Sequence, residues 1–353
     1  MKGAVRFAAI ILMMLPTLFA NSSCSEAQVK LHILEAGSLI IPFEEVEKEF
    51  EELHPNIDVL MEGHGSIQVI RHITEIHDEV DLAAVADCSL IPMLMYPVQL
   101  PDNQGTYANW TISFATNHLG LAYTPQSQYA DEINANNWFD ILSRDNVTVG
   151  FSDPRFDACG YRAFMLIKLA EDHYRNPSIF EELVANNFQS KIKVIEEDST
   201  SVIRIPELLE STKKRIILRG FSVQLLALLE SHDLDYAFQY KSVAQQHGLE
   251  FLELPHQIDL SSNEFSTDYQ KVKVELDYRR FLSVTPEFQG QLIVYGITIP
   301  ANAPHPEEAI EFLEFLLGPD GQRILEDCSQ PVILPIADNV NNLPAELRAL
   351  IEQ

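Results

Sequence analysis

Residues 29–84 read VKLHILEAGSLIIPFEEVEKEFEELHPNIDVLMEGHGSIQVIRHITEIHDEVDLAA, and this stretch decides the fold. It alternates short apolar runs with longer segments whose apolar residues recur at helical spacing. The runs span 29–34, 57–62 and 80–84, and small-residue turns at 35–38 and 63–66 follow the first two. Such an alternation of strands and helices predicts a parallel sheet covered by helices.

The same alternation continues through the rest of the chain. Further strands are expected at 119–123, 147–151, 192–195, 236–240, 251–254 and 292–299, and further helices at 161–173, 221–229 and 306–317, with a final helix around 321–327. We interpret this order as an α/β protein of two lobes, each a mostly parallel sheet flanked by helices. The chain is expected to cross between the lobes near 114–118 and near 288–293. The first lobe then comprises 29–114 and 291–353, and the second lobe comprises 115–290.

The composition narrows the classes of function. The chain has 353 residues, a formal net charge of −28 and an apolar fraction of 46%. It is too apolar for a disordered protein. Binding a phosphate backbone needs clustered Lys and Arg, so the acidic balance argues against nucleic acid. A small anion remains a suitable ligand only if local N–H donors attract it, because the overall field repels it.

The N-terminus has the features of an export signal. Lys2 and Arg6 precede an apolar run over 7–20, which is shorter than the roughly 20 residues of a membrane span. Cys24 follows this run, where a lipid-modified N-terminus would be generated. We therefore expect residues 1–28 to be a signal peptide and anchor region, and the protein to be periplasmic or on the cell surface. Lipid attachment at Cys24 stays open.

Cysteines and histidines do not form a metal motif in the sequence. Cys24, Cys88, Cys159 and Cys328 include no CxxC pair, and if Cys24 is removed or modified, at least one of the other three must be a free thiol. His64, His72 and His77 are eight and five residues apart, which does not place them on one helical face, and no HExxH is present. These spacings argue against a zinc site and a catalytic metal.

Two serines mark a candidate anion site. Ser38 and Ser66 each stand where a strand gives way to a helix, so hydroxyl and helix N–H groups can point at one anion. A serine that only caps its helix explains either position taken alone, but two at equivalent places favour a site. Neither lies in the G-x-S-x-G pattern of a nucleophile elbow.

Eight stretches, in this order and spacing, carry a resemblance to a known family. They are AGSLIIPFEEVEKEFEELHP, EGHGSIQVIRHITE, DLAAVADCSLIP, SFATNHLGLAYT, NNWFDIL, GFSDPRFDACGYR, DYAFQYKSVAQQHGL and IVYGITIP. The chain resembles the archaeal-type molybdate/tungstate-binding proteins of ABC importers, the WtpA/ModA type. The resemblance implies a type II periplasmic-binding-protein fold whose two lobes close on one oxyanion at a hinge. It implies neither chemistry on the ligand nor a cofactor.

The resemblance also implies roles for individual residues. Ser38 of AGSL and Ser66 of HGSI would donate hydroxyl and backbone hydrogen bonds from the first lobe. Cys159 of DACGYR would contribute mainly its backbone N–H, and Tyr240 of FQYKSVA its phenol. Asp157 occupies the position where this branch places a carboxylate close to the molybdenum or tungsten atom, so it is a candidate ligand to that metal.

One departure from the family pattern concerns the coordination of the ligand. The branch supplies a second carboxylate from the segment that here reads DYAFQYK, where Gln239 or Lys241 occupies the matching position. Neither side chain is a carboxylate, which favours a tetrahedral, hydrogen-bonded oxyanion over six-fold coordination of the metal. The neutral Gln239 amide also removes one repulsive charge from a dianion site.

The resulting hypothesis is an exported solute-binding protein, not an enzyme, that captures molybdate or tungstate and delivers it to an ABC permease. We expect a monomer that binds no nucleic acid. One alternative is a binding protein for sulfate, phosphate or a small carboxylate, because a fold does not fix its ligand. A less favoured alternative is an extracellular hydrolase that uses Asp157 or His64.

Overall fold

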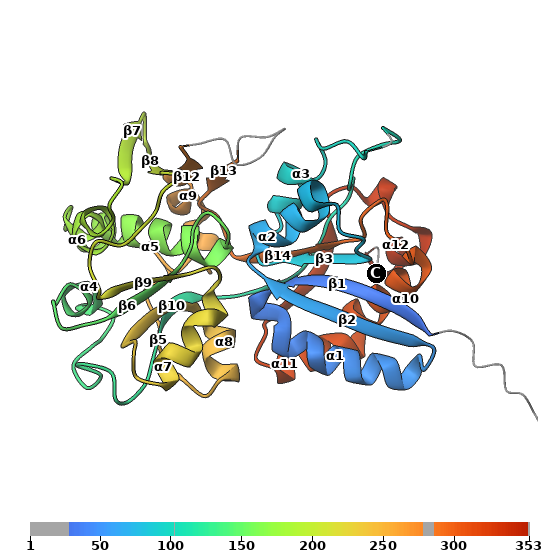
Figure 1. The fold of residues 1–353 in the computed structure, drawn as a ribbon, viewed down its shortest axis with the longest axis horizontal. Coiled ribbons are helices and arrows are strands. Elements are labelled where there is room, and N and C mark those ends of the chain that lie inside the picture. Colours follow the sequence, from blue (N-terminus) through green and yellow to red (C-terminus); the bar gives the residue numbers. More distant parts are fainter. Residues whose placement is uncertain (1–27, 102, 278–285, 352–353) are drawn as a thin grey trace, which may run out of the picture.

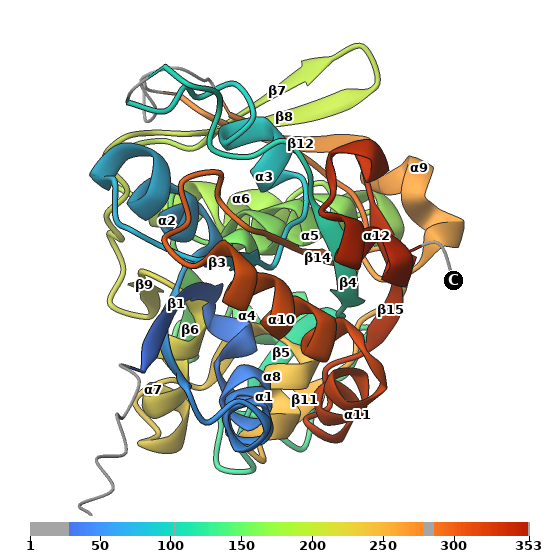
Figure 2. The same cartoon turned by 90° about the vertical axis from the view of Figure 1, so that its right-hand side faces the viewer.

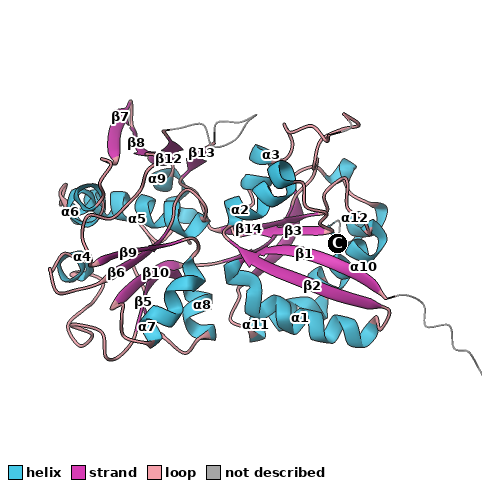
Figure 3. Ribbon diagram, in the orientation of Figure 1, coloured by secondary structure: helices cyan, strands magenta, loops and turns pink. Residues whose placement is uncertain are grey.

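The computed structural model describes residues 28–101, 103–277 and 286–351, which form two lobes (Figure 1). In the first lobe a six-stranded sheet has the order β15-β4-β14-β3-β1-β2, and in the second lobe a five-stranded sheet has the order β11-β5-β10-β6-β9. A smaller four-stranded sheet, β13-β12-β8-β7, lies beside the second lobe (Figure 3). The predicted signal segment and Cys24 lie outside the described residues.

The elements of the first lobe come from both ends of the described chain. They are β1 (Val29–Ala36), α1 (Ile40–Leu53), β2 (Ile57–His64), α2 (Ser66–Arg71), β3 (Leu82–Val85), α3 (Leu90–Leu94), β4 (Ile112–Thr116), β14 (Val294–Thr298), α10 (Pro306–Leu317), α11 (Pro319–Asp327), β15 (Val332–Ala337) and α12 (Ala345–Ile351). Helices α2 and α3 lie on one side of the sheet and α1 and α11 on the other (Figures 1 and 2). Phe50 of α1 packs edge-on against Phe312 of α10, with ring centroids 5.1 Å apart.

The second lobe is built from the middle of the chain. Its main elements are β5 (Leu119–Tyr123), α4 (Trp138–Leu142), β6 (Val149–Ser152), α5 (Ala158–Tyr174), α6 (Ile179–Leu183), β9 (Ile216–Arg219), α7 (Leu226–Glu230), β10 (Tyr236–Tyr240), α8 (Lys241–Gln246) and β11 (Glu250–Leu252). The smaller sheet contains β7 (Lys193–Glu197), β8 (Thr200–Ile205), β12 (Val272–Leu276) and β13 (Glu287–Gln289), and α9 (Ser266–Tyr269) precedes β12. Helix α5 is buried along almost its whole length. No helix among the described residues combines the length and apolar character needed to cross a bilayer.

The predicted α/β class is confirmed, and the strands over 119–123 and 236–240 and the helix over 306–317 have the predicted bounds. The sheets themselves are mixed. Strand β1 pairs in parallel with β2 and β3, and β6 with β9 and β10, whereas β14 and β5 pair antiparallel with their neighbours. The prediction that 321–327 is the final helix was wrong, because β15 and α12 follow it. No sequence pattern after residue 327 had been assigned to a strand or a helix, so β15 and α12 were not predicted.

Among the described residues, the chain passes between the first lobe and the second at two places. Strand β4 ends at Thr116 in the six-stranded sheet and β5 begins at Leu119 in the five-stranded sheet, while β13 of the smaller sheet ends at Gln289 and β14 of the six-stranded sheet begins at Val294. These passages overlap the expected ranges 114–118 and 288–293, and β4 ends two residues beyond the expected lobe limit of 114. The exact domain limits stay predictions. The consequence for the site is that Asn117 and His118 form one connection between the lobes.

Glu35, at the end of β1, is a buried carboxyl group whose Oε2 atom has no hydrogen-bond partner. Burial raises its pKa from 4.5 to about 8, and the neighbouring Glu44 and Glu62 add to this rise. A carboxyl with a raised pKa in the folded state binds more protons folded than unfolded. Its stabilising effect is therefore complete below pH 4.5 and is lost as the pH rises through about 8.

We predict that Glu35→Gln increases the free energy of unfolding at pH 7 by roughly 1–3 kcal/mol and removes a decline in stability between pH 4.5 and 8. Denaturant unfolding across this pH range measures both effects. The exposed Glu307 on α10 provides the control, since Glu307→Gln should leave the pH profile unchanged. An equal pH slope in the native chain and Glu35→Gln would contradict the prediction.

Candidate functional site

The carboxyl ends of two sets of parallel strands face each other where the lobes meet. In the first lobe, β1, β2 and β3 lead to Ser38, Ser66 and Ala86. In the second lobe, β6, β9 and β10 lead toward Asp157, Ser222 and Tyr240. Open α/β sheets bind ligands outside the carboxyl ends of their strands. The junction between the lobes is therefore the candidate site.

Glycines let the two lobes approach closely at this junction. A Cβ atom on Gly65 would lie 2.4 Å from the carbonyl oxygen of Phe156, and one on Gly37 would lie 2.8 Å from the Phe221 ring. The backbone N–H of Ile67 donates across the junction to the Phe156 carbonyl at 3.0 Å. Any larger residue at Gly65 would push the lobes apart. The small residues in the two turns thus serve the contact between lobes.

Ser38 and Ser66 are buried at the junction with their hydroxyl oxygens already accepting hydrogen bonds. Ser38 Oγ accepts from the Tyr295 hydroxyl at 2.8 Å, and Ser66 Oγ accepts from the Ala86 N–H at 3.0 Å. Neither serine caps its helix with its side chain. Because each oxygen is an acceptor in these bonds, each hydroxyl hydrogen is free to point at an anion.

Asp157 precedes α5 and is 5% exposed. Its Oδ2 accepts a hydrogen bond from the backbone N–H of Ser222 at 3.1 Å. Burial raises the pKa of Asp157 from 3.8 to about 6, although the Ser222 N–H and the nearby Arg162 charge oppose this rise. Near neutral pH this side chain can exchange a proton, and in its protonated form it can donate a hydrogen bond.

Cys159, Gln239 and Tyr240 complete the predicted set on the second lobe, and all three are buried. The Cys159 thiol points to the Phe238 carbonyl at 3.5 Å, and its backbone N–H acts on the Asp157 carboxyl group, where it opposes the rise of that pKa. Gln239 Oε1 accepts from the Tyr240 N–H at 2.9 Å, and Gln239 Nε2 has no hydrogen-bond partner. Cys88, Cys159 and Cys328 are all free thiols, whereas the cysteine count required at least one.

The sequence reasoning did not assign a role to Arg162, the buried cation at this junction. Its Nη1 donates to the Ala86 carbonyl at 2.6 Å and to the Tyr240 hydroxyl at 2.9 Å. Its Nη2 forms an ion pair with Asp87 Oδ2 at 3.3 Å. Tyr161 also donates to Asp87, at 2.6 Å. One guanidinium of the second lobe therefore contacts two consecutive residues of the first.

Tyr295 of β14 is a second residue that the sequence reasoning did not single out. Its hydroxyl accepts from Asn117 Nδ2 at 3.0 Å and donates to Ser38. Asn117 Nδ2 also donates to Ser242 of α8 at 2.8 Å. This chain of hydrogen bonds links the connection between the lobes to a candidate ligand-binding serine. Arg162 lies in the motif DACGYR and Tyr295 lies in the motif IVYGITIP. Their presence in these family motifs was the signal by which the sequence could have singled them out.

Two buried polar atoms at or near the junction lack a full hydrogen-bond partner. They are Gln239 Nε2, which has none, and Arg162 Nη2, which has only its ion pair. A buried donor without an acceptor costs about 1–3 kcal/mol, so such groups usually mark a place for a ligand or water. Hydroxyl, amide and guanidinium donors together match the acceptor atoms of a small anion.

Two of the three histidines that the spacing argument separated lie next to each other in the structure. His64 ends β2 instead of lying on a helix, and its ring stacks on His72 with centroids 4.5 Å apart. Each has a carboxylate neighbour of its own, Glu62 for His64 and Asp78 for His72. His77 instead contacts the Tyr107 hydroxyl. The argument from helical spacing considered only histidines on one helix. It could therefore not reveal a pair in which His64 lies on a strand and His72 on a helix.

Two α/β lobes that place buried hydrogen-bond donors between them define a binding protein for a small polar solute. The chain belongs to the bacterial extracellular solute-binding protein family, whose profile matches residues 31–328. It is accordingly a solute-binding protein of an ABC importer, and this family is exported.

Relatives with high coverage sharpen this classification. The molybdate/tungstate-binding protein WtpA of Thermococcus kodakarensis is 37% identical over 339 residues, which cover 94% of this chain and 90% of that protein. An uncharacterized solute-binding protein of Methanoculleus marisnigri is 43% identical over 325 residues, covering 92% of this chain and 87% of its own. The predicted resemblance to the WtpA type is confirmed.

Solved structures support the fold. The periplasmic molybdate-binding protein of Azotobacter vinelandii superposes with a TM-score of 0.52 at 13% identity, covering 87% of this chain and 100% of that one. The sulfate-binding protein SubI of Mycobacterium tuberculosis gives a TM-score of 0.52 at 12% identity, covering 86% and 87%. At these identities the likeness establishes the type II binding-protein fold alone.

We predict that Arg162→Met lowers the free energy of unfolding by about 3–5 kcal/mol, because it leaves the buried Asp87 carboxylate without its cation. Denaturant unfolding measures the change. The double variant Arg162→Met/Asp87→Asn should recover part of it, since no charge is then buried unpaired. If Arg162→Met is as stable as the native protein, the Asp87 carboxylate is not left buried and unpaired, which would mean that the lobes separate and expose it to water.

Proposed function

We propose that this protein captures molybdate or tungstate between its lobes and delivers it to the permease of an ABC importer. The observation that carries the proposal is the set of buried donors left for a ligand at and near the junction, namely Gln239 Nε2, which has no acceptor, and the Ser38 and Ser66 hydroxyls, whose oxygens already accept hydrogen bonds within the protein. The similarity to WtpA proteins over more than nine-tenths of the chain supports this choice of anion.

The donors are suited to a tetrahedral dianion. Ser38 and Ser66 offer hydroxyl hydrogens from the first lobe, and Gln239 and the start of α5 at Cys159 offer N–H groups from the second. Every donor needs an acceptor lone pair, so a protonated anion fits less well. Charge-assisted hydrogen bonds in a buried site are stronger than neutral ones, and closure of the lobes excludes water from them.

Coordination through hydrogen bonds is favoured over six-fold coordination of the metal. Gln239 is a donor where the related proteins were expected to supply a carboxylate, and it cannot act as an anionic metal ligand. Asp157 has a pKa raised to about 6 by burial, so below this pH it carries a proton that it can donate to an oxyanion. The neutral Gln239 amide and a protonated Asp157 would both donate hydrogen bonds to the oxygens of a tetrahedral oxyanion and would not bind its metal atom.

Closure follows as a shift between two arrangements of the lobes. A ligand that contacts both lobes binds the closed arrangement more tightly and so increases its population. The same closed arrangement contains the contacts of Arg162 with Ala86 and Asp87. We propose that this loaded form, a monomer anchored at Cys24 or free in the periplasm, is the one the permease recognises.

Calorimetric titration of residues 29–353 with molybdate, tungstate, sulfate and phosphate tests the proposal. We expect one-to-one binding of the first two anions and no heat from the others, because the larger ions fill the donor set. Binding of sulfate or phosphate in place of both metal oxyanions would favour the alternative anion carrier. Release of product from a hydrolysable ester would instead revive the hydrolase hypothesis.

We predict that Ser38→Ala and Ser66→Ala each weaken molybdate binding by about 1–3 kcal/mol, because a charged acceptor loses its partner. The same titration measures the loss. Ser143, whose hydroxyl bonds the Phe139 carbonyl at the end of α4, supplies a matched control, and Ser143→Ala should bind normally. Unchanged affinity in both junction variants would remove these serines from the site.

The substitution Gln239→Glu tests the coordination. For a hydrogen-bonded ion we expect at least about tenfold weaker binding of molybdate and tungstate, since the change removes a donor and adds a like charge. The native protein and the variant should both give no heat with sulfate. Tungstate binding as tight as or tighter than that of the native protein would mean that the new carboxylate acts as a metal ligand, and the tetrahedral assignment would then be wrong.

A further inference from the structure

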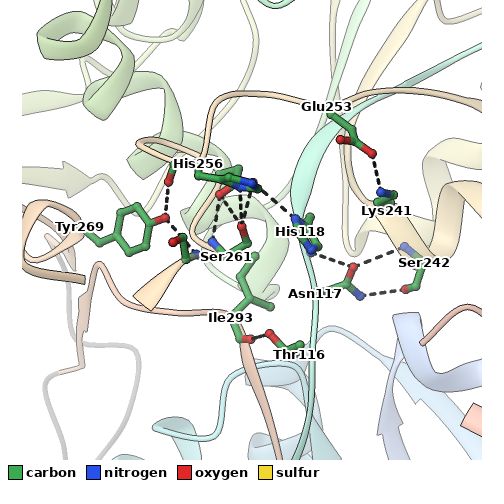
Figure 4. A network of polar contacts seen from close by, with 12 residues as sticks. Thr116, Asn117, His118, Lys241, Ser242, Glu253, His256, Ser261, Tyr269 and Ile293 are labelled. Atoms are coloured by element: carbon green, nitrogen blue, oxygen red, sulfur yellow. Dashed lines mark hydrogen bonds and ion pairs between the residues drawn. The ribbon is translucent and has the colours of Figure 1, made fainter. Parts of the chain in front are cut away.

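A separate cluster of metal-ligating side chains lies at the connection between the lobes. His118 follows Asn117 in the segment between β4 and β5, and His256 and Asp259 lie in the loop that follows β11. Figure 4 shows His118 and His256 converging on the same group of polar contacts. The ligand atoms of His118, His256 and Asp259 all lie within 4.8 Å of one another. None of these residues belongs to the oxyanion site.

The distances in the cluster suit one small cation. The Nδ1 atoms of His118 and His256 lie 3.4 and 3.0 Å from the same oxygen, Asp259 Oδ2. In a tetrahedral zinc site with metal–ligand bonds of about 2.0–2.1 Å, neighbouring ligand atoms are separated by about 3.3 Å. Two imidazole nitrogens and one carboxylate oxygen are also the ligand types that zinc-like ions select.

The carboxylate is held in place by groups other than the histidines. Asp259 is 2% exposed, and its Oδ1 accepts from the backbone N–H of Ser261 at 3.0 Å and from the Ser261 hydroxyl at 2.7 Å. Such supporting hydrogen bonds orient a metal-binding carboxylate and are a regular feature of metal sites. The Ser261 hydroxyl also lies 2.9 Å from Oδ2 and 3.1 Å from His256 Nδ1, so Oδ2 faces both imidazoles and this hydroxyl.

The surroundings allow a cation to enter and be retained. The side chains of His118 and His256 are 37% and 59% exposed, so solvent reaches the open side of the cluster and can supply a fourth ligand. The nearby Lys241 ammonium is paired with Glu253, which neutralises its charge. The formal net charge of −28 also favours the approach of cations.

We propose that His118, His256 and Asp259 form a binding site for a divalent transition-metal ion of the zinc type, with water completing a tetrahedral coordination. The ion would join the first connection between the lobes to the 256–261 loop. That loop already bonds both connections, through Leu119 N–H to the Asp259 carbonyl at 3.2 Å and Ile293 N–H to the Leu260 carbonyl at 2.9 Å. The proposal does not depend on which oxyanion the protein carries.

Cobalt(II) is the probe for the experiment, because its visible absorption reports tetrahedral coordination and zinc competes for the same ligands. Untagged, metal-free protein is titrated with cobalt and then with zinc. We expect one cobalt per chain with a tetrahedral spectrum that zinc abolishes. His118→Ala and His256→Ala should each weaken binding by at least about tenfold, since each removes one of three protein ligands.

Two control variants make the result decisive. His247, an exposed histidine at the end of α8, provides a matched surface control, and His247→Ala should bind cobalt normally. His72→Ala tests the stacked His64–His72 pair as a competing site. Loss of binding in His72→Ala with full binding in His118→Ala would overturn the proposal, as would an octahedral spectrum or no spectrum in the native protein.

Thermal unfolding provides an independent readout that separates binding from folding. Cobalt should raise the unfolding midpoint of the native protein and of His247→Ala, and should leave that of His118→Ala unchanged. The metal-free midpoints show whether each variant is folded. A midpoint of His118→Ala that rises with cobalt as much as that of the native protein would also overturn the proposal.

Discussion

The junction between the lobes depends on one buried cation. Arg162 lies on α5 of the second lobe, and its guanidinium is compensated by Asp87 and the Ala86 carbonyl of the first. Removing a charge from water costs several kcal/mol unless an opposite charge and hydrogen bonds satisfy it. The partners of Arg162 are therefore complete only when the lobes are together. In this arrangement the protein itself compensates the charge of Arg162, so a ligand is not needed to neutralise it.

An acidic protein can hold the proposed anion only through local groups. The overall field of a chain with a net charge of −28 repels a dianion, so attraction has to arise within a few ångströms. In the proposed site, hydroxyl groups, the Gln239 amide and a helix start would supply it without adding further charge. Asp157 would oppose it when ionised, but burial raises its pKa to about 6 and makes protonation accessible. The charge close to the proposed site is therefore less negative than the net charge of the whole chain suggests.

The sequence predicted those parts of the fold and site that local pattern controls. The positions of Ser38 and Ser66 after β1 and β2 could be predicted because strand ends and small-residue turns are visible in the chain, whereas their role in binding stays a prediction. Arg162 and Tyr295 were present in quoted motifs, but their roles depend on partners across the junction that no periodicity reveals. For the same reason, the His64–His72 stack was missed, since it joins a strand to a helix. In the smaller sheet only β7 overlaps a predicted strand, at 192–195, and β8, β12, β13 and β15 were not predicted.

The two proposed ionic sites differ in a way that follows from the sign of the protein's charge. An anion can be held only where donors are concentrated and water is excluded, which requires a buried junction between lobes. A cation is attracted by the surface as a whole, so a half-exposed cluster such as His118 with Asp259 is sufficient to bind one. The cluster also lies at the connection about which the proposed closure would occur. A bound cation would therefore act on the geometry of the connection, whereas the proposed anion would act on the distance between the lobes.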